Sequence, residues 1–418
     1  MPQGTVAIAG AGLAGFQAAS ALREQKYSGR VVLVGEELHP PYHRPPLSKA
    51  VLMGTADEAS IAMRPANYYA DRQIELLTST RAVAIDRTHH KLALDNGAVI
   101  DYEHLILAVG ARNRPFHVPG NDLSGVFYLR DLGEARSLRA QLTSVKRAVI
   151  IGAGFIGLEI ATAAVKLGIE VTVLEVADRP MSRAVSAPMS ALFAREHSMR
   201  GVRFLFNTQV KCLLGEAGKV FAAETVEGQI IPGDIVVIGI GVIPNVELAA
   251  TCNLELQNGI VVDANLATAD ARISAIGDCA SYPSPFSVHE LVRLESVQNA
   301  TEQARCVAAR ILGKAMPYAA VPWFWSDQGP LKLQIAGLTA GYDECIVRGD
   351  ASGTSCAMFC FRGEQLLGVE TVNRPADHMA ARRLLGHHIA LTPAQAADET
   401  LELKQLIAGA TAAAHTQS

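Results

Sequence analysis

The stretch Val6–Gly15, VAIAGAGLAG, decides the fold of this chain. Val6–Ala9 is a short apolar run that predicts a buried strand, and Leu13–Arg23 predicts a helix with its apolar residues on one side. Of the three glycines in this stretch, the first permits a tight turn, the second admits a pyrophosphate close to the backbone, and the third lets helix and strand pack closely. Free N–H groups and the helix dipole favour the phosphate charge. The residues expected to bind this dinucleotide are Gly10, Gly12, Leu13, Ala14 and Gly15.

The same pattern occurs twice in the chain. Val31–Val34 predicts the second strand of the first copy, and Glu36 follows it, where a carboxylate can accept hydrogen bonds from ribose hydroxyls. The second copy begins with a strand at Ala148–Ile151 and continues with a helix to Leu167 and a strand at 171–174 that Glu175 ends. Its loop residues are Gly152, Gly154, Phe155, Ile156 and Gly157. Two such fingerprints predict two bound dinucleotides.

The acid of the second copy bears on which nicotinamide coenzyme binds there. A carboxylate at Glu175 would repel the 2′-phosphate of NADP(H), which favours NAD(H). Arg179 and Arg183 follow closely and could accommodate that phosphate, so NADPH remains the less favoured alternative. If one dinucleotide is a nicotinamide, the other should exchange hydride with it, and FAD is the natural candidate.

Two further motifs fit a flavin. Gly277-Asp278 ends a predicted strand, where the aspartate could hold ribityl hydroxyls, although the pair could also be an ordinary turn. The helix predicted from Glu295 could aim its N-terminus at the flavin edge that gains negative charge on reduction.

Pro45–Lys49 indicates a helix start that could fix a lysine near the flavin. Glu159 could pair with Lys49 beside the nicotinamide. The alternatives are a solvated lysine and an exposed helical glutamate.

The rest of the chain alternates short strands and helices. Strands are expected at 81–85, 91–94, 105–109, 202–206, 220–225, 235–240 and 273–276, and a long helix at Glu295–Leu312. From Trp323 the alternating pattern predicts a separate antiparallel sheet. After Pro393 we expect one helix with a frayed, alanine-rich end.

Composition excludes several classes of protein. The net charge of −4 gives no general attraction to nucleic acid or an anionic membrane. Thr5–Leu22 carries no charge, but its glycines suit a phosphate-binding turn better than a membrane span. The 7 cysteines form no CxxC pair, which favours a reduced, cytoplasmic protein. No His/Cys cluster, P-loop or GxSxG elbow is present, so no metal site, phosphoryl transfer or serine hydrolysis is expected.

Several motifs together resemble one known family. They are Gly10–Gly15, RPPLSK at Arg44–Lys49, LAVGA at Leu107–Ala111, Gly152–Glu159, GIGVIPN at Gly239–Asn245, AIGDCA at Ala275–Ala280, ESVQNA at Glu295–Ala300, PWFWSDQ at Pro322–Gln328 and TVNRP at Thr371–Pro375. This set resembles the FAD-containing, NADH-dependent ferredoxin reductases of bacterial oxygenase systems. The likeness covers nearly the whole chain, and PWFWSDQ with ESVQNA is its most specific part.

The resemblance implies a glutathione-reductase-like α/β fold with two Rossmann-type dinucleotide-binding domains and a C-terminal α+β domain. The FAD domain would comprise residues 1–108 and 245–322, the NAD domain residues 109–244, and the C-terminal interface domain residues 323–418. Residues implied at FAD, besides the first glycine loop, are Glu36, Glu37 (through its backbone), Arg44, Pro45, Lys49, Val83, Ala108, Gly110, Arg130, Gly277, Asp278, Glu295, Val297 and Trp323 or Trp325. Those implied at NADH, besides the second loop, are Glu159, Glu175, Arg183, Gly239 and Gly241.

The cysteine positions bear on where the electrons go. Disulfide reductases of this fold need a cysteine pair on the flavin, and no cysteine precedes Cys212. Cys279 follows Asp278 and is expected to be an inert buried thiol. A flavin accepts a hydride as an electron pair and can release single electrons, so an external one-electron acceptor fits best.

The family implies a [2Fe-2S] ferredoxin as this acceptor, docking near Arg64, Arg305, Arg310 and Lys332 on a monomer or weak dimer. The alternatives are an NADH oxidase, a rubredoxin or monodehydroascorbate-type reductase, and an apoptosis-inducing-factor-like NADH sensor.

Overall fold

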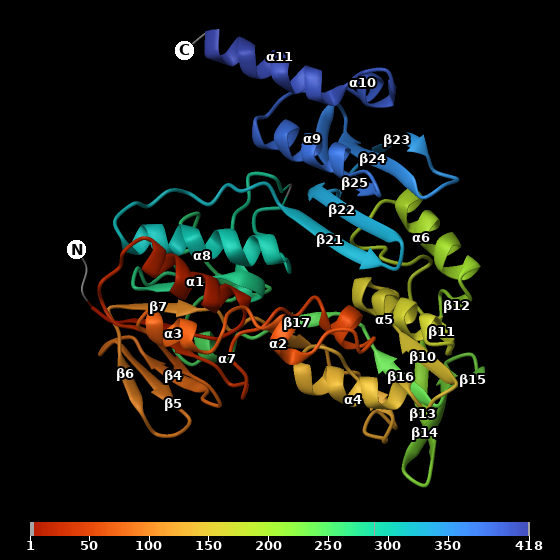
Figure 1. Cartoon of the computed structure of the whole chain (residues 1–418), viewed down its shortest axis with the longest axis horizontal. Helices are drawn as coiled ribbons and strands as arrows, with labels where there is room; N and C mark the ends of the chain where they lie inside the picture. The colour runs from red at the N-terminus through yellow and green to blue at the C-terminus, as the bar shows by residue number, and fades with distance from the viewer. Residues whose placement is uncertain (1–3, 288, 417–418) are drawn as a thin grey trace. The chain divides into compact units, whose positions relative to one another are not determined.

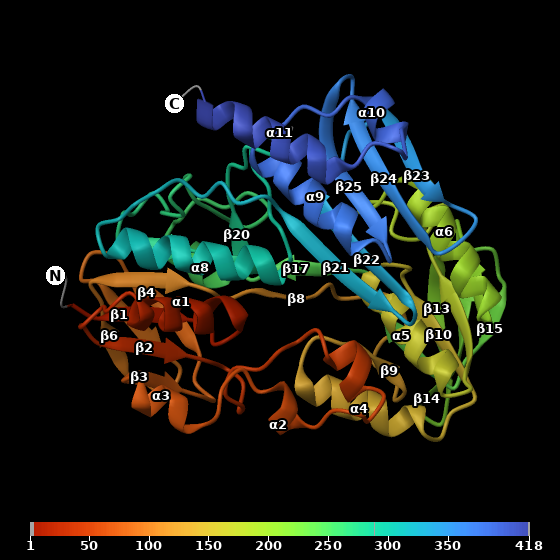
Figure 2. The same ribbon diagram turned by 45° about the horizontal axis from the view of Figure 1, so that its top comes forward.

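The computed structural model describes residues 4–287 and 289–416 and is drawn from two sides in Figures 1 and 2. The chain forms two compact units, each assembled from separated segments. Unit 1 comprises the N-terminal segment through His43, Glu58–Arg112 and Val242–Ala320. Unit 2 comprises Arg44–Asp57, Asn113–Gly241 and the chain from Val321 onward.

Unit 1 is built on a five-stranded sheet in which every neighbouring pair is parallel. Its strands, in spatial order, are β19 (Ile273–Ala275), β7 (His104–Leu107), β1 (Val6–Ala9), β2 (Val31–Val34) and β3 (Ile74–Leu77). All four residues of β1 and of β2 are buried, as expected for a parallel sheet covered on both faces. Two long helices, α1 (Leu13–Glu24) and α8 (Val297–Ile311), lie side by side in Figure 1.

Smaller elements complete unit 1. An antiparallel meander is formed by β4 (Ala82–Asp86), β5 (Lys91–Leu94) and β6 (Val99–Asp101). The remaining pieces are α2 (Glu58–Ile61), α3 (Asn67–Asp71), α7 (Glu247–Ala250), β18 (Ile260–Val261), the 3₁₀ turn η2 (Gly277–Cys279) and β20 (Ala280–Ser281). β8 (Ala111–Asn113) and β17 (Val242–Pro244) lie where the chain passes between the units.

Unit 2 repeats the βαβ pattern. Its parallel sheet has the order β12 (Val202–Leu205), β11 (Glu170–Leu174), β10 (Arg147–Ile151), β16 (Ile235–Ile238) and β9 (Val126–Phe127). The helices are α4 (Leu132–Leu142), α5 (Phe155–Lys166) and α6 (Ala187–Met199), and a π-helical turn, η1 (Leu47–Val51), joins them from the early segment. A second meander is formed by β13 (Val210–Glu216), β14 (Lys219–Thr225) and β15 (Ile230–Pro232).

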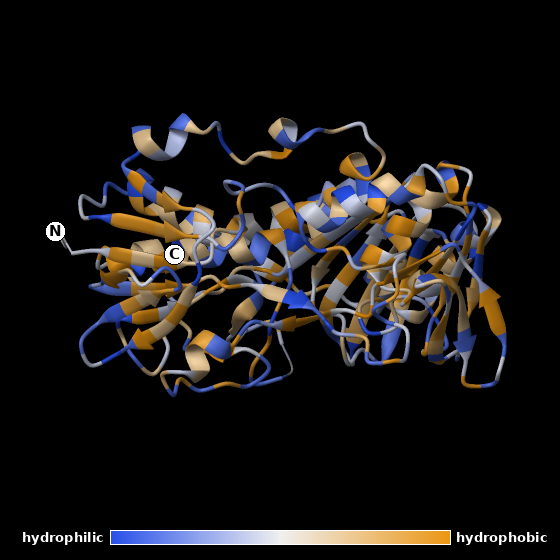
Figure 3. Cartoon of the chain, turned by 90° about the horizontal axis from the view of Figure 1, so that it is seen from below, coloured by the Kyte–Doolittle hydropathy of each residue, from blue (hydrophilic) through white to orange (hydrophobic). Residues whose placement is uncertain are grey.

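The C-terminal part of unit 2 is an antiparallel sheet with helices against it. The strand order is β21 (Trp323–Gln328), β22 (Leu331–Gly337), β25 (Gln365–Val372), β24 (Ser355–Arg362) and β23 (Glu344–Asp350). Helix α9 (Pro375–Gly386) packs on β22 and β25, and Figure 2 shows β21 running toward α5 of the same unit. In Figure 3 the hydrophobic colour gathers on the strands and the loops are largely hydrophilic.

The tail after Pro393 differs from the sequence prediction. It forms two helices, α10 (Pro393–Ala397) and α11 (Leu403–Thr416), so the prediction of one helix with a frayed end is wrong. The buried Arg348 side chain explains the break, because its guanidinium donates to the carbonyl oxygens of Asp398 at 2.8 Å and Leu401 at 2.6 Å. The Asp398 carboxylate also accepts hydrogen bonds from the backbone N–H and hydroxyl of Thr400, which turns the chain.

The helix expected from Glu295 starts two residues later than predicted. Ser296 is its N-cap, and the Ser296 hydroxyl accepts a hydrogen bond from the backbone N–H of Asn299 at 3.1 Å. Glu295 therefore lies outside α8 and pairs with Arg293 at 2.8 Å. Among residues 4–287 and 289–416, the structure contains no helix with the length and apolar content that crossing a bilayer requires.

Candidate functional site

The first glycine loop has the geometry of a phosphate cradle. Gly10 has φ +110°, and a Cβ there would lie 2.2 Å from the carbonyl oxygen of Ala108, so only glycine fits. Gly12 is the N-cap of α1; among the described residues no side chain caps that helix, and no atom lies within 4 Å of a Cβ built on Gly12. The first-turn N–H groups of α1 thus donate to no capping side chain and the loop leaves room beside Gly12, which fits a dinucleotide pyrophosphate.

The second loop repeats this arrangement in unit 2. Gly152 has φ +102°, and its Cβ would lie 2.5 Å from the carbonyl oxygen of Gly239. Gly154 is the N-cap of α5, again without a side-chain cap, and the nearest atom to its Cβ would be 4.0 Å away. Phe155 and Ile156 open the helix, with Ile156 exposed. The residues present thus fit a second dinucleotide.

The acids that follow the two loops are held differently. Glu36 is exposed just beyond β2, where it is free to meet a ribose, and the carboxylate of Glu37 accepts a hydrogen bond from the Tyr42 hydroxyl at 2.5 Å. Glu175 accepts hydrogen bonds from the backbone N–H of Ala153 at 2.7 Å and of Ala177 at 2.9 Å. The Glu175 carboxylate therefore fixes the second glycine loop as well as placing negative charge beside it.

The two arginines after Glu175 have different roles in the fold. Arg179 donates to the carbonyl oxygens of Ser182 at 2.9 Å and Val185 at 3.0 Å, so its guanidinium is engaged by its own loop. Arg183 is exposed, with a guanidinium nitrogen 3.6 Å from a Cβ built on Gly241. Of this pair, Arg183 is the one whose guanidinium lies beside the Gly239–Gly241 loop.

The turn at Asp278 is held from α8. The backbone N–H of Gly277 donates to the Gln303 side chain at 2.7 Å, and Gln303 is fully buried. Arg293 donates to the backbone carbonyl of Asp278 at 3.0 Å. Cys279 is fully buried, as predicted, and burial raises the pKa of its thiol to about 11, which disfavours the reactive thiolate.

Lys49 and Glu159 form the most distinctive pair of unit 2. Lys49 Nζ lies 2.6 Å from Glu159 Oε2, and Glu159 is only 5% exposed although it sits on a helix. Lys49 also donates to the carbonyl oxygen of Pro45 at 3.2 Å. Ser48 donates to the same glutamate oxygen at 2.5 Å and Ser326 donates to Oε1 at 2.6 Å. The carboxylate is thus held by one cation and two hydroxyls.

The two tryptophans lie together on β21. The ring centroids of Trp323 and Trp325 are 5.5 Å apart, and both side chains are half-buried. Helix α9 supplies two neighbours of Trp323, the His378 ring at 5.8 Å and the Arg382 guanidinium at 4.8 Å. The Arg382 contact is a cation–π interaction.

Other predicted site residues are placed as follows. In unit 2, Arg44 donates to the carbonyl oxygen of Arg130 at 2.6 Å. In unit 1, Gly110 has φ +66° just after the buried Ala108, Val83 is exposed on β4, and Val297 is the first residue of α8. No group of three or more His, Cys, Asp or Glu side chains is arranged to hold a metal within the described residues.

The four residues predicted to dock a partner differ in their exposure and in their contacts. Arg305 is exposed beside Glu302, Lys332 is exposed on β22, and Arg64 lies over the Tyr68 ring at 5.5 Å. Arg310 instead donates to the carbonyl oxygen of Ala271 at 3.1 Å and to the Ser274 hydroxyl, and burial lowers its pKa. Because its guanidinium holds unit 1 together, Arg310 is poorly suited to meet a partner.

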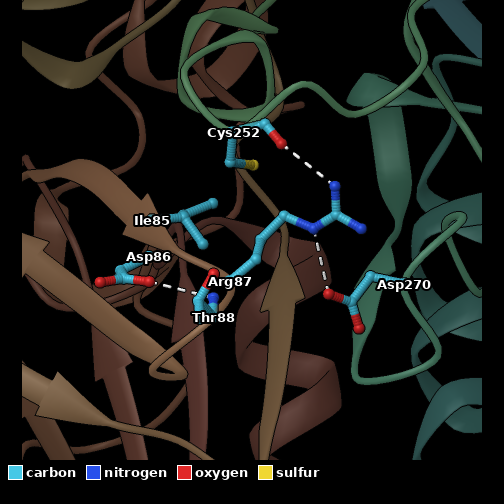
Figure 4. Close-up of a pocket in the computed structure, with 6 residues that line it drawn as sticks. All are labelled: Ile85, Asp86, Arg87, Thr88, Cys252 and Asp270. Carbon is cyan, nitrogen blue, oxygen red and sulfur yellow. Dashed lines mark hydrogen bonds and ion pairs between the residues drawn. The ribbon is translucent and has the colours of Figure 1, made fainter.

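An open pocket in unit 1 is separate from these groups. Figure 4 shows Arg87 reaching from the β4 end toward Asp270 and Cys252. Its guanidinium donates to Asp270 at 3.1 Å and to the Cys252 carbonyl at 3.2 Å. Neither predicted glycine loop contributes to its lining, which is Ile85, Asp86, Arg87, Thr88, Cys252 and Asp270. We infer that the Arg87 contacts are structural and hold the end of β4 to the segments around Cys252 and Asp270.

Sequence reasoning missed the hydroxyls around Glu159. Ser48 and Ser326 lie inside the motifs RPPLSK and PWFWSDQ, but neither was singled out. The alternation of Trp323-Phe324-Trp325-Ser326 would have placed Ser326 on the strand face opposite the tryptophans. It would not have identified Glu159 as the partner, because that contact joins segments 167 residues apart.

Comparison with known proteins identifies the family of this chain. Residues 4–304 match the family described as "Pyridine nucleotide-disulphide oxidoreductase", and residues 323–407 match "Reductase C-terminal". Rhodocoxin reductase of Rhodococcus erythropolis is 52% identical over 97% of this chain and 94% of its own length.

Two solved structures are also similar. A ferredoxin reductase of the CYP199A2 system from Rhodopseudomonas palustris has a TM-score of 0.94 and 49% identity, covering 96% of this chain and 99% of that one. The covalent putidaredoxin reductase–putidaredoxin complex gives a TM-score of 0.95 and 39% identity, covering 99% and 100%. The predicted glutathione-reductase-like fold is confirmed, and the chain belongs to the pyridine nucleotide-disulphide oxidoreductase family, within its ferredoxin reductases.

Proposed function

We propose that this chain is an FAD-dependent NADH:ferredoxin reductase that supplies electrons to an oxygenase through a [2Fe-2S] ferredoxin. The observation that carries the proposal is the pair of uncapped helix N-termini, α1 and α5, each opening on a glycine cradle. One cradle would hold FAD and the other NADH. A bound flavin takes a hydride as an electron pair and hands electrons on singly.

Some residues of the chain would bind the two coenzymes, and others would act through their charge. Gly10, Gly12 and Glu36 would hold the adenine half of FAD, and Asp278 would hold the ribityl chain. Glu175 would meet the adenosine ribose of NADH and disfavour the 2′-phosphate of NADPH. Lys49, fixed by Glu159, would present positive charge to the flavin and stabilise the negative charge it gains on reduction.

Two observations support a separate protein as the electron acceptor, namely the names of the similar proteins and the positions of the cysteines in this chain. The similar proteins are named as a rhodocoxin reductase and a ferredoxin reductase for the CYP199A2 system, and a third was crystallised in complex with putidaredoxin. In this chain the first cysteine is Cys212, and Cys279 beside Asp278 is buried with a raised pKa. Electrons would therefore leave for a separate protein, docking at Arg64, Arg305 and Lys332, with Trp323 or Trp325 near the exit.

Three further points belong to the proposal. The FAD domain would comprise residues 1–108 and 245–322 and enclose an NAD domain at 109–244, and the interruption of unit 1 by unit 2 supports this division. The protein would act in the cytoplasm, in keeping with its unpaired cysteines. It would work as a monomer or weak dimer.

Anaerobic titration with NADH tests the proposal. The flavin-loaded protein should bleach with one equivalent of NADH and then reduce cytochrome c only when a [2Fe-2S] ferredoxin is added. Turnover with oxygen alone at the ferredoxin-supported rate would indicate an NADH oxidase. An NADH-dependent change in size-exclusion volume with long-lived charge-transfer colour would indicate a redox sensor.

A further inference from the structure

A buried hydrogen-bond chain leads away from Glu159 into the C-terminal sheet. A carboxylate only accepts, so the Ser326 hydroxyl donates to Glu159 Oε1 at 2.6 Å. Ser326 Oγ in turn accepts from Gln328 Nε2 at 3.2 Å, which leaves the amide oxygen of Gln328 facing His197 Nε2 at 2.7 Å. That imidazole nitrogen must then carry the proton. Every donor in this Glu159 chain (Ser326, Gln328 and His197) points toward the carboxylate.

The Glu159 chain is shielded from water along its length. Ser326, Gln328 and His197 are 0%, 1% and 2% exposed. Burial lowers the pKa of His197, which favours the neutral ring, and the contact with the Gln328 amide oxygen then requires the tautomer with its proton on Nε2. A buried acceptor that loses its donor is not compensated by solvent, so removing the Ser326 hydroxyl would leave Glu159 Oε1 unsatisfied.

The hydrogen bonds of the Glu159 chain also fix the orientation of the carboxylate. Glu159 Oε2 accepts from Lys49 at 2.6 Å and from Ser48 at 2.5 Å, both from the early segment of unit 2. Ser326 holds the other oxygen from the C-terminal strand β21. With its two oxygens bound from different segments, the carboxylate plane cannot rotate, and Oε2 stays directed at Lys49.

The position of β21 explains how a distant segment reaches this glutamate. The rings of Phe324 and Phe155 are in contact, tilted at 39° with their centroids 4.5 Å apart, and a Cβ on Gly329 would lie 3.2 Å from Thr162, so β21 runs along α5. Ser326 meets Glu159 on the same helix. Trp323, on the opposite strand face from Phe324, contacts α9. One strand thus carries both the aromatic pair and the support for Glu159.

We infer that Ser326, supported by Gln328 and His197, is a positioning residue for hydride transfer: it keeps Glu159 directed at Lys49 and so fixes the lysine charge on which the proposed flavin reduction depends. This inference rests on the proposed function and extends it. The C-terminal sheet then forms part of the NADH half-reaction in addition to any role in meeting ferredoxin.

Three substitutions at position 326 test the inference. Ser326→Thr keeps the hydroxyl, Ser326→Val has the shape of threonine without it, and Ser326→Ala serves if the larger side chains prevent folding. In anaerobic stopped-flow experiments with the flavin-loaded protein, we expect the limiting rate of flavin reduction to fall about tenfold or more in Ser326→Val and Ser326→Ala. Ser326→Thr should retain the parent rate, with flavin content and the NADH dissociation constant near those of the parent.

A substitution at the next member of the Glu159 chain and a control in the same sheet complete the test. Gln328→Leu should lower the rate of flavin reduction less than Ser326→Ala does, because the Ser326 hydroxyl remains but no longer accepts a hydrogen bond from Gln328. Thr371→Val removes another buried hydroxyl, which bonds to the Gln334 carbonyl, and should leave the rate unchanged.

Equal rates in Ser326→Thr and Ser326→Val, or a parent rate in Ser326→Ala, would overturn the inference. A parent protein whose flavin NADH does not reduce would instead refute the proposed function.

Discussion

Among single residues, the Lys49–Glu159 pair carries most of the proposed chemistry. Burying a carboxylate is costly unless it is paired and hydrogen-bonded, and Glu159 receives one cation and two hydroxyl donors. That arrangement holds the Lys49 ammonium in one place while leaving the side chain about a quarter exposed. The pair therefore provides a fixed positive charge, which costs no reorganisation when negative charge develops beside it.

Replacing Lys49 by methionine tests the charge. Lys49→Met should slow flavin reduction by NADH at least about tenfold, a barrier increase of about 1.4 kcal/mol. It should also lower the thermal midpoint, because it leaves the Glu159 carboxylate buried without its cation. The double variant Lys49→Met/Glu159→Gln should regain stability but not rate.

The matched control for this change is Lys211→Met. Lys211 pairs with Glu224 at 2.7 Å but is largely exposed, so both rate and midpoint should stay at parent values. Unchanged bleaching kinetics in Lys49→Met would remove the lysine from the mechanism.

A second single-residue prediction concerns coenzyme choice. Glu175→Gln removes the charge that opposes a 2′-phosphate, so the ratio of kcat/KM for NADH to that for NADPH should fall about tenfold. Arg179→Gln should leave the ratio unchanged, because that guanidinium is bonded to carbonyls of its own loop. A ratio that responds to Arg179 and not to Glu175 would reverse this assignment.

The glycine loops were predictable from sequence and the supports around them were not. Gly10 and Gly152 follow buried strands and open helices, and that local pattern alone predicted two cradles. The Lys49–Glu159 pair could be suggested only as one alternative, since the contact spans 110 residues. The resemblance implies a docking role for Arg310, and the sequence does not reveal that its guanidinium binds Ser274 and the Ala271 carbonyl.

Among the elements, buried strands were located well and the C-terminal tail was not. β1, β2 and β5 lie at their predicted residues because short apolar or alternating runs are local signals. The break between α10 and α11 depends on Arg348, a side chain from a strand some 50 residues earlier. No local pattern contains that interaction, so the sequence predicts a single helix for the tail.

Helix α9 supplies a pH-dependent element. His378 is 1% exposed, both ring nitrogens lack hydrogen-bond partners among the described residues, and burial lowers its pKa to about 4 from 6.5. Between these values the unfolded chain binds more protons than the folded one, so stability is present above pH 6.5 and is lost as pH falls. From pH 7 to pH 5 the loss should be about 2 kcal/mol.

Tryptophan fluorescence can measure this loss. The chain has 2 tryptophans, Trp323 and Trp325, and both lie in β21 beside α9. The denaturation midpoint by tryptophan emission should drop from pH 7 to pH 5 in the parent. It should drop less in His378→Phe, which keeps a ring but cannot take a proton. Equal drops in both proteins would show that His378 does not contribute.

For the whole molecule, the proposed function requires two coenzyme cradles and an electron acceptor outside the chain. Each unit carries one cradle on a parallel sheet, and unit 2 also carries the antiparallel sheet with the tryptophans. Cys279, the cysteine beside Asp278 in unit 1, is poorly suited to relay electrons as a thiol, since it is buried with its pKa raised to about 11. The chain should therefore deliver electrons without forming a thiol intermediate.

The most direct test counts electrons while thiols are blocked. The flavin-loaded protein is treated with N-ethylmaleimide, mixed anaerobically with excess oxidised [2Fe-2S] ferredoxin and given one equivalent of NADH. The account predicts about two reduced ferredoxins per NADH, with or without alkylation. An alkylated protein whose flavin is still bleached by NADH but which reduces no ferredoxin would contradict it.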